Sequence, residues 1–370
     1  MAIIYSIGKN LVSVDEYERL NQQGQISDFI KEPKNKRFEF DLRGSKISCD
    51  SLFRTFTLAG GETVEPQPIG IGKPLTVYIQ HIYLGDNGKN DLLVTSAIKS
   101  IIESKPAPRA INLLIEKAKN KDHVDFTATD LCTPLVYYSP SLTESYTILT
   151  IEMILDRFNK EIFDQIGEGM NTAGALPIFA TASQFLFAGG AISKLIGKIG
   201  ESIFDGSPFF RESKKLTFDF AGMPQILSGQ ILLVNDEHEQ HILTNYNVDQ
   251  KGKLVPKNAT IPADVNYPYI TIYLDGTPHD EFKKFKPQTD SIDIVDRFFH
   301  IKTTNQQMQM ASLIDAVSLY NDFSYREKAM NIKNQLDGMS NASPEYKNLK
   351  VKYEAILKNI QNDLFKIKEA

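Results

Sequence analysis

Residues 75–84 read LTVYIQHIYL, and the turn sequence GDNG follows at residues 85–88. β-Branched and aromatic side chains dominate the first run, and such side chains favour a pleated strand. Glycine, aspartate and asparagine favour the tight turn that ends it. A second apolar run then extends from Leu92 to Ile98 and predicts a second strand. These two runs decide the β-rich class of the first half of the chain.

Similar short strands are predicted on both sides of this pair. They fall at residues 2–7, 38–42, 111–115, 131–138, 146–155, 216–220, 230–234 and 269–274. Turn residues separate most of them, and long helices do not. This spacing favours antiparallel sandwiches.

The middle and the end of the chain break this pattern. Residues 169–193 contain no charged side chain and are rich in glycine and alanine, which predicts an apolar helical segment. In the tail, apolar residues recur at three- and four-residue steps, and Ser343-Pro344-Glu345 is a typical helix start. This spacing predicts that the tail forms a helical hairpin or a short coiled-coil arm.

The predicted fold is mainly β with α. Two β-sandwich-like units are joined by the apolar helical segment and are followed by the C-terminal helical hairpin. The expected units are residues 1–168, the apolar segment 169–205, a second β-rich unit 206–302, and the tail 303–370.

Composition limits the classes of function. The chain has 370 residues, a formal net charge of −5, 42% hydrophobic and 24% charged residues, and two cysteines. This balance is typical of a folded protein and gives no reason to expect nucleic-acid binding. Two cysteines do not form a disulfide framework, and the apolar run at the N-terminus is too short for a signal peptide. We therefore expect a cytoplasmic protein.

Two stretches resemble C2-type β-sandwich domains. In the first, LTVYI at residues 75–79 leads into DNGKNDLLV at residues 86–94; in the second, residues 149–152 lead into DRFNK at residues 156–160 and FDQIG at residues 163–167. In calcium-binding C2 domains, loops at these places hold the metal through clustered carboxylates. The resemblance implies calcium as a ligand, with Asp86, Asp91, Asp156 and Asp164 as its candidate binding residues. The alternative is that these aspartates are ordinary turn and cap residues.

Catalytic motifs are not recognisable in the sequence. Nothing near Cys49 marks an activated thiol, and the serines lack a G-x-S-x-G elbow. His238 and His241 stand three residues apart, but a metal site needs further ligands in fixed geometry. We predict that the chain is not an enzyme and has no cofactor other than the calcium considered above.

The two remaining features concern contacts with other molecules. The uncharged segment is either a helix buried between the β-rich units or a segment that enters a membrane. The tail either packs onto its own body or binds a protein partner, including a second copy. The candidate membrane or partner contacts are Phe185, Phe187, Leu195, Ile196, Ile199, Tyr353, Ile356, Ile360 and Leu364. We predict a non-catalytic interaction or scaffold protein that acts through its tail and its sandwich loops. The alternative is a membrane-associated or membrane-inserting effector that uses residues 169–200.

Overall fold

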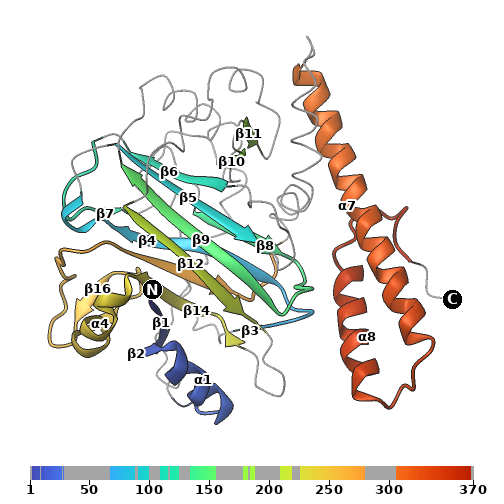
Figure 1. The fold of residues 1–370 in the computed structure, drawn as a ribbon, viewed down its shortest axis with the longest axis horizontal. Coiled ribbons are helices and arrows are strands. Elements are labelled where there is room, and N and C mark those ends of the chain that lie inside the picture. Colours follow the sequence, from blue (N-terminus) through green and yellow to red (C-terminus); the bar gives the residue numbers. More distant parts are fainter. Residues whose placement is uncertain are drawn as a thin grey trace, which may run out of the picture.

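The structure is a computed structural model. The described residues are 2–8, 10–26, 28, 67–87, 91–99, 109–115, 117–124, 134–155, 178–181, 184–187, 209–218, 226–279 and 306–367. Two large antiparallel sheets, two small two-stranded sheets and several helices, including a C-terminal pair, make up this part of the chain (Figure 1). The prediction of a mainly β fold with a C-terminal helical hairpin is therefore confirmed.

The larger sheet has seven strands in the order β2-β1-β14-β17-β4-β7, and β8 also pairs with β4. Its strands are β1 (Ala2–Ile7), β2 (Asn10–Ser13), β4 (Leu75–Tyr83), β7 (His123–Val124), β8 (Leu135–Ser139), β14 (Gly229–Val234) and β17 (Tyr269–Asp275). All nine residues of β4 are buried. A strand with both faces covered needs a nearly continuous apolar run, which explains the sequence of residues 75–84.

The smaller sheet has six strands in the order β11-β10-β6-β5-β9-β12. Its strands are β5 (Leu92–Lys99), β6 (Arg109–Ile115), β9 (Tyr146–Leu155), β10 (Ile178–Thr181), β11 (Gln184–Phe187) and β12 (Phe210–Thr217). The strands β4 and β5 thus lie in different sheets, although they follow one another in the sequence. The turn between them contains the 3-10 helix η2 (Gly85–Asn87) and carries the chain from one sheet to the other.

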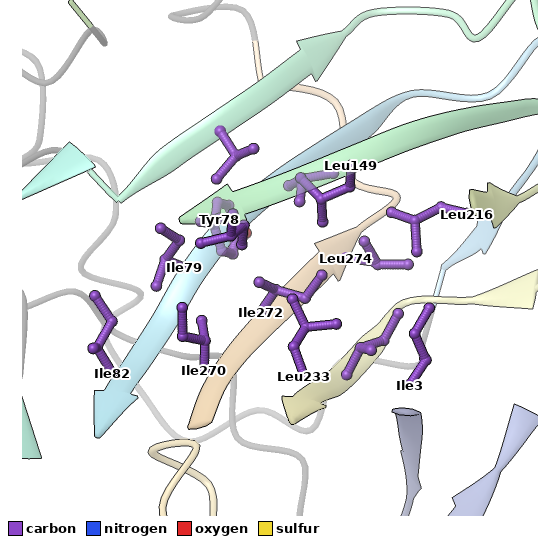
Figure 2. Packing of buried hydrophobic residues seen from close by; sticks show 14 of the residues in the cluster. Ile3, Tyr78, Ile79, Ile82, Leu149, Leu216, Leu233, Ile270, Ile272 and Leu274 are labelled. Carbon is purple, nitrogen blue, oxygen red and sulfur yellow. The ribbon is translucent and has the colours of Figure 1, made fainter. Parts of the chain in front are cut away.

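The main core lies between the two sheets. One cluster of buried side chains contains residues of both, with Ile272 and Leu274 from β17, Leu149 from β9 and Leu216 from β12. Figure 2 shows Leu149 and Leu216 opposite Tyr78 and the β17 residues. Alternating residues of the two inner faces fill this space, as in sandwiches generally.

Strand order differs from the predicted division into two sandwich-like units. The strand β14, from the second predicted unit, lies between β1 and β17. The strand β17 in turn pairs with β4, and β12 pairs with β9. Residues 1–168 and 206–302 therefore share the same two sheets. Side-chain alternation reports which face of a strand is buried, but it does not report which strand is its neighbour.

The predicted apolar helical segment also differs where the structure describes it. Residues 178–181 and 184–187 form the antiparallel strands β10 and β11, and β10 pairs with β6. Small and aromatic residues at these positions fit a sheet edge as well as a buried helix, so composition alone did not separate the two. The rest of residues 169–205, including Leu195, Ile196 and Ile199, lies outside the described residues.

A second, smaller core covers the outer face of the larger sheet. Buried residues of β1, β14 and β17 contact the helix α4 (Glu239–Asn245) and the hairpin of β15 (Tyr246–Val248) and β16 (Leu254–Pro256). The 3-10 helix η4 (Asp236–His238) precedes α4. On the inner side, α1 (Val14–Gln22) buries Tyr17 and Leu20 in the main core. Burial raises the pKa of Tyr17 to about 12.

The C-terminal hairpin consists of α7 (Gln306–Leu336) and α8 (Pro344–Leu357). The start of α8 agrees with the predicted helix start, because Ser343 caps the helix and Pro344 occupies its first turn.

Two short strands form a separate antiparallel pair. They are β3 (Pro68–Ile69) and β13 (Ile226–Leu227).

Replacing Ser343 by alanine should lower the free energy of unfolding of the hairpin by about 1 kcal/mol. The Ser343 hydroxyl accepts a hydrogen bond from the backbone N–H of Tyr346 at 3.1 Å, and alanine cannot accept it. The measurement is helix content during thermal unfolding, followed by circular dichroism. Ser343→Asp is the control, since aspartate is also a good cap and should keep the wild-type midpoint.

Candidate interaction surface

The hairpin interior contains three of the four tail residues that the sequence offered as partner contacts. Tyr353, Ile356 and Ile360 are buried in one cluster with side chains of α7. Only Leu364 is exposed, at 79%. For the first three, the intramolecular alternative is the one that the structure shows, because α8 folds back on α7. A binding surface on the hairpin therefore has to use other residues.

Exposed large apolar side chains are concentrated on this hairpin. Seven of the eight found among the described residues lie in α7, in α8, in the turn between them or in the segment after α8, and Ile261 is the exception. The seven are Leu319, Tyr320, Phe323, Met330, Met339, Val351 and Leu364. Single exposed apolar residues are common on proteins, but a concentration of them marks an interaction surface.

Helix α7 has two apolar faces. Tyr325, Ala329, Ile332 and Leu336 recur at steps of four, three and four residues and pack against α8. A second set recurs on the other side of the helix: Leu319, Phe323 and Met330 fall within roughly 40° of one another at 3.6 residues per turn. We call this second set the α7 stripe. All three of its side chains are exposed, between 36% and 47%.

The two helices of the hairpin differ in length. The 31 residues of α7 span about 46 Å and the 14 residues of α8 about 21 Å at 1.5 Å per residue. In Figure 1, α7 extends well beyond α8 at its N-terminal end. The helix α8 therefore covers one side of α7 over only part of its length. The α7 stripe lies on a different side of α7 and is exposed.

The segment after α8 borders the stripe. The Phe323 and Phe365 rings meet edge to face with centroids 6.3 Å apart. The Arg326 guanidinium donates a hydrogen bond to the carbonyl oxygen of Leu364 at 3.3 Å. Asp322, which is buried, accepts the backbone N–H groups of Gln361 and Asn362 at 3.1 and 2.7 Å. These contacts hold residues 361–365 against α7 beside the stripe.

The hairpin is attached to the sandwich through polar contacts. Asn359, which is 2% exposed, donates from Nδ2 to the carbonyl oxygens of Ser141 and Ala355 at 2.9 and 2.8 Å. Lys352 Nζ lies 3.9 Å from a carboxylate oxygen of Glu144. Both contacts come from α8 or the turn after it, so α8 is the helix of the hairpin that these contacts join to the sandwich.

The predicted calcium residues are only partly described. Asp86 lies 3.9 Å from Lys121 Nζ, and its backbone N–H donates to the carbonyl oxygen of Asn266. Asp91 accepts the backbone N–H of Lys117 at 2.9 Å. These are contacts of turn and cap residues. Asp156 and Asp164 lie outside the described residues, so the calcium site stays a prediction.

The structure describes the two histidines that the sequence offered as possible metal ligands. His238 stacks on the Tyr267 ring at 3.8 Å, and His241 Nδ1 lies 3.1 Å from the Asn245 amide. Within the described residues, no three or more His, Cys, Asp or Glu side chains are grouped so that they could hold a metal ion. Cys49 and the side chains of Phe185 and Phe187 lie outside the described part.

The buried polar groups of the sandwich serve packing. Tyr83 and Tyr269 stack at 5.0 Å, and His81 Nε2 lies 3.1 Å from His123 Nδ1 beside them. Burial raises the pKa of both tyrosines well above the ordinary value. The hydroxyl groups of Tyr83 and Tyr269 are hydrogen-bonded to the backbone of Val265 and Leu254. These stacked rings and their hydrogen bonds connect the second core to the larger sheet.

Comparison with known proteins gives no family. No model of a known protein family matches the chain, and no curated protein gives a significant match. The resemblance to C2 domains therefore stays a prediction. Over the part of the chain that the structure describes, no helix is both long and apolar enough to cross a bilayer.

Sequence reasoning missed Phe323 and Met330. It assigned a single apolar face to each helix of the tail. Helix α7 has two such faces, one that packs against α8 and the α7 stripe. The signal that could have found them is the excess of apolar residues in 306–336 over what a single seam requires.

Proposed function

We propose that the chain is a non-catalytic protein-binding protein, and that its C-terminal hairpin presents the α7 stripe to another polypeptide chain. The observation that carries this proposal is the concentration of exposed large apolar side chains on the hairpin. A protein surface rich in such side chains loses unfavourable contact with water when a partner covers it.

The shape of the hairpin supports a helical or flat protein partner. The stripe runs along a straight helix rather than into a hollow, and such a face is recognised by apolar side chains at helical spacing. Phe323 and Met330 suit this role, since aromatic residues and methionine are enriched at interfaces. The charges beside the stripe, Arg326 and Glu327, are of opposite sign, which favours a protein partner over an anionic lipid surface.

Photocross-linking tests the proposed function in the cells from which the sequence derives. A photoreactive phenylalanine analogue at position 323 should form cross-links to polypeptides that mass spectrometry identifies. The same analogue at Glu345, an exposed position at the start of α8, is the matched control and should give none. Equal cross-linking at both positions, or none at position 323, would contradict the proposal.

A further inference from the structure

Two histidines on neighbouring strands of the larger sheet form a hydrogen-bonded pair. His81 lies on β4 and His123 on β7, and His81 Nε2 is 3.1 Å from His123 Nδ1. His81 is completely buried, whereas 21% of the His123 side chain is exposed. We propose that this imidazole pair is a pH-sensitive latch, which keeps the short strand β7 on β4 at neutral pH and releases it in acid. The latch does not depend on the α7 stripe.

The hydrogen bond limits the number of protons that the pair can hold. One of the two facing nitrogens has to be unprotonated in order to accept. The intact pair therefore takes up one proton beyond its neutral form. If both rings were imidazolium ions, two donors and two positive charges would face each other at 3.1 Å. A second added proton thus breaks the pair.

The surroundings favour the first added proton on His123. Its Nε2 lies 3.9 Å from a carboxylate oxygen of Asp264, and a nearby negative charge favours the charged form of a ring. Burial disfavours a positive charge on His81. His81 therefore stays neutral and accepts the hydrogen bond from His123, and the second proton would have to go to the buried ring.

Other groups around the pair do not supply a counter-charge for that second proton. The rings of Tyr83 and Tyr269 lie against the two imidazoles, and burial keeps both tyrosines neutral by raising their pKa. The charged residues that flank these contacts on the neighbouring segments are Lys121, Asp122, Asp249, Lys251, Lys253 and Asp264. They comprise three of each sign. The carboxylate of Asp249 already accepts the backbone N–H groups of Lys251 and Lys253.

Strand β7 is held by few backbone contacts. It has two residues, which pair with Ile82 and Tyr83 of β4, and it ends the described strand order on that side. The segment before it is tied by two further hydrogen bonds, from the Leu84 N–H to the Asp122 carbonyl oxygen and from the Lys121 N–H to the Gly85 carbonyl oxygen. Release of β7 would move His123 away from His81 and admit water to the buried ring, at little cost to the rest of the sheet.

Hydrogen exchange of the full chain, followed by mass spectrometry between about pH 7.5 and about pH 5, tests the latch. Protection factors are compared, since they remove the intrinsic pH dependence of exchange. In peptides that cover residues 121–124 they should fall about tenfold per pH unit below about pH 6, because the open form binds one proton more than the closed form. Peptides from β14 in the same sheet should keep their protection. His81→Gln retains a polar atom near the Nε2 position but does not titrate, so it should abolish the fall.

Three results would overturn the inference: no fall in the unaltered chain, an equal fall in His81→Gln, or a parallel fall in β14, which would mean that the whole sheet opens. If His81→Gln does not fold, nuclear magnetic resonance of the imidazole nitrogens in the unaltered chain decides. His123 should then become charged while His81 stays neutral for as long as β7 remains protected. A charged His81 ring in the closed form would refute the latch.

Discussion

Replacing Asp275 by alanine should lower the free energy of unfolding by about 3 kcal/mol. The Asp275 carboxylate accepts hydrogen bonds from the Tyr78 hydroxyl at 2.8 Å, from His279 Nε2 at 3.0 Å and from the backbone N–H of Thr277 at 2.8 Å. Only 14% of its side chain is exposed, so water cannot easily replace the lost acceptor. Three donors that the fold holds in place would then lose their shared partner.

Two milder variants separate the contributions, and urea denaturation measures all three. Asp275→Asn keeps the volume and one carbonyl oxygen, so it should cost clearly less than alanine. Tyr78→Phe removes a single donor and should cost about 1 kcal/mol. If Asp275→Ala cost no more than Tyr78→Phe, the carboxylate would not be the centre of this network.

The contribution of Asp275 should depend on pH. Burial alone would raise the pKa of Asp275, but the hydrogen bonds from His279, Thr277 and Tyr78 together lower it below the ordinary value. The unfolded chain therefore takes up the proton at a higher pH than the folded chain. The stabilisation is complete above the unfolded pKa of about 4, and it is lost as the pH falls through the folded pKa.

The stability advantage of the unaltered chain over Asp275→Asn should accordingly shrink as the pH falls from about 5 to about 3. Asparagine does not titrate in this range, so the difference between the two chains isolates the carboxyl group. A constant difference across this range would contradict the lowered pKa.

Local patterns predicted many elements correctly. Residues 2–7 form β1, and the apolar run from residue 75 forms β4. Ser343 caps α8 as expected. These elements depend on neighbouring residues in the sequence, such as a cap three positions from its acceptor or alternation along one strand. Sequence reasoning reaches such features because their physical causes are local.

Long-range pairing was beyond the same reasoning. The strand β14 inserts between β1 and β17, and it meets β1 across more than two hundred residues of sequence. Its apolar side chains fit many neighbours equally well, so its pattern does not select one. The α7 stripe was missed for a related reason. The prediction assigned one apolar face to each helix of the tail, whereas α7 has two.

Replacing Gly85 by alanine should lower the free energy of unfolding by about 3 kcal/mol. Gly85 has a φ of +58°, a conformation that costs an alanine about 1 kcal/mol. An added Cβ would also lie 2.5 Å from the carbonyl oxygen of Asn266 and 2.7 Å from the carbonyl carbon of Tyr267. Both are backbone atoms, so no side-chain rotation can relieve the contact.

Gly24→Ala is the matched control for this prediction. Gly24 has a similar φ of +66°, but nothing lies within 4 Å of the position its Cβ would take. Its substitution therefore measures the backbone cost alone, about 1 kcal/mol. The loop at Gly85 is tied by the Asp86 N–H to Asn266 and by the Lys121 N–H to the Gly85 carbonyl. Movement away from the added Cβ would stretch these bonds, so urea denaturation should show a clearly larger loss for Gly85→Ala than for Gly24→Ala. Equal losses would mean that the loop moves at little cost and that the close approach to Asn266 is not required by the fold.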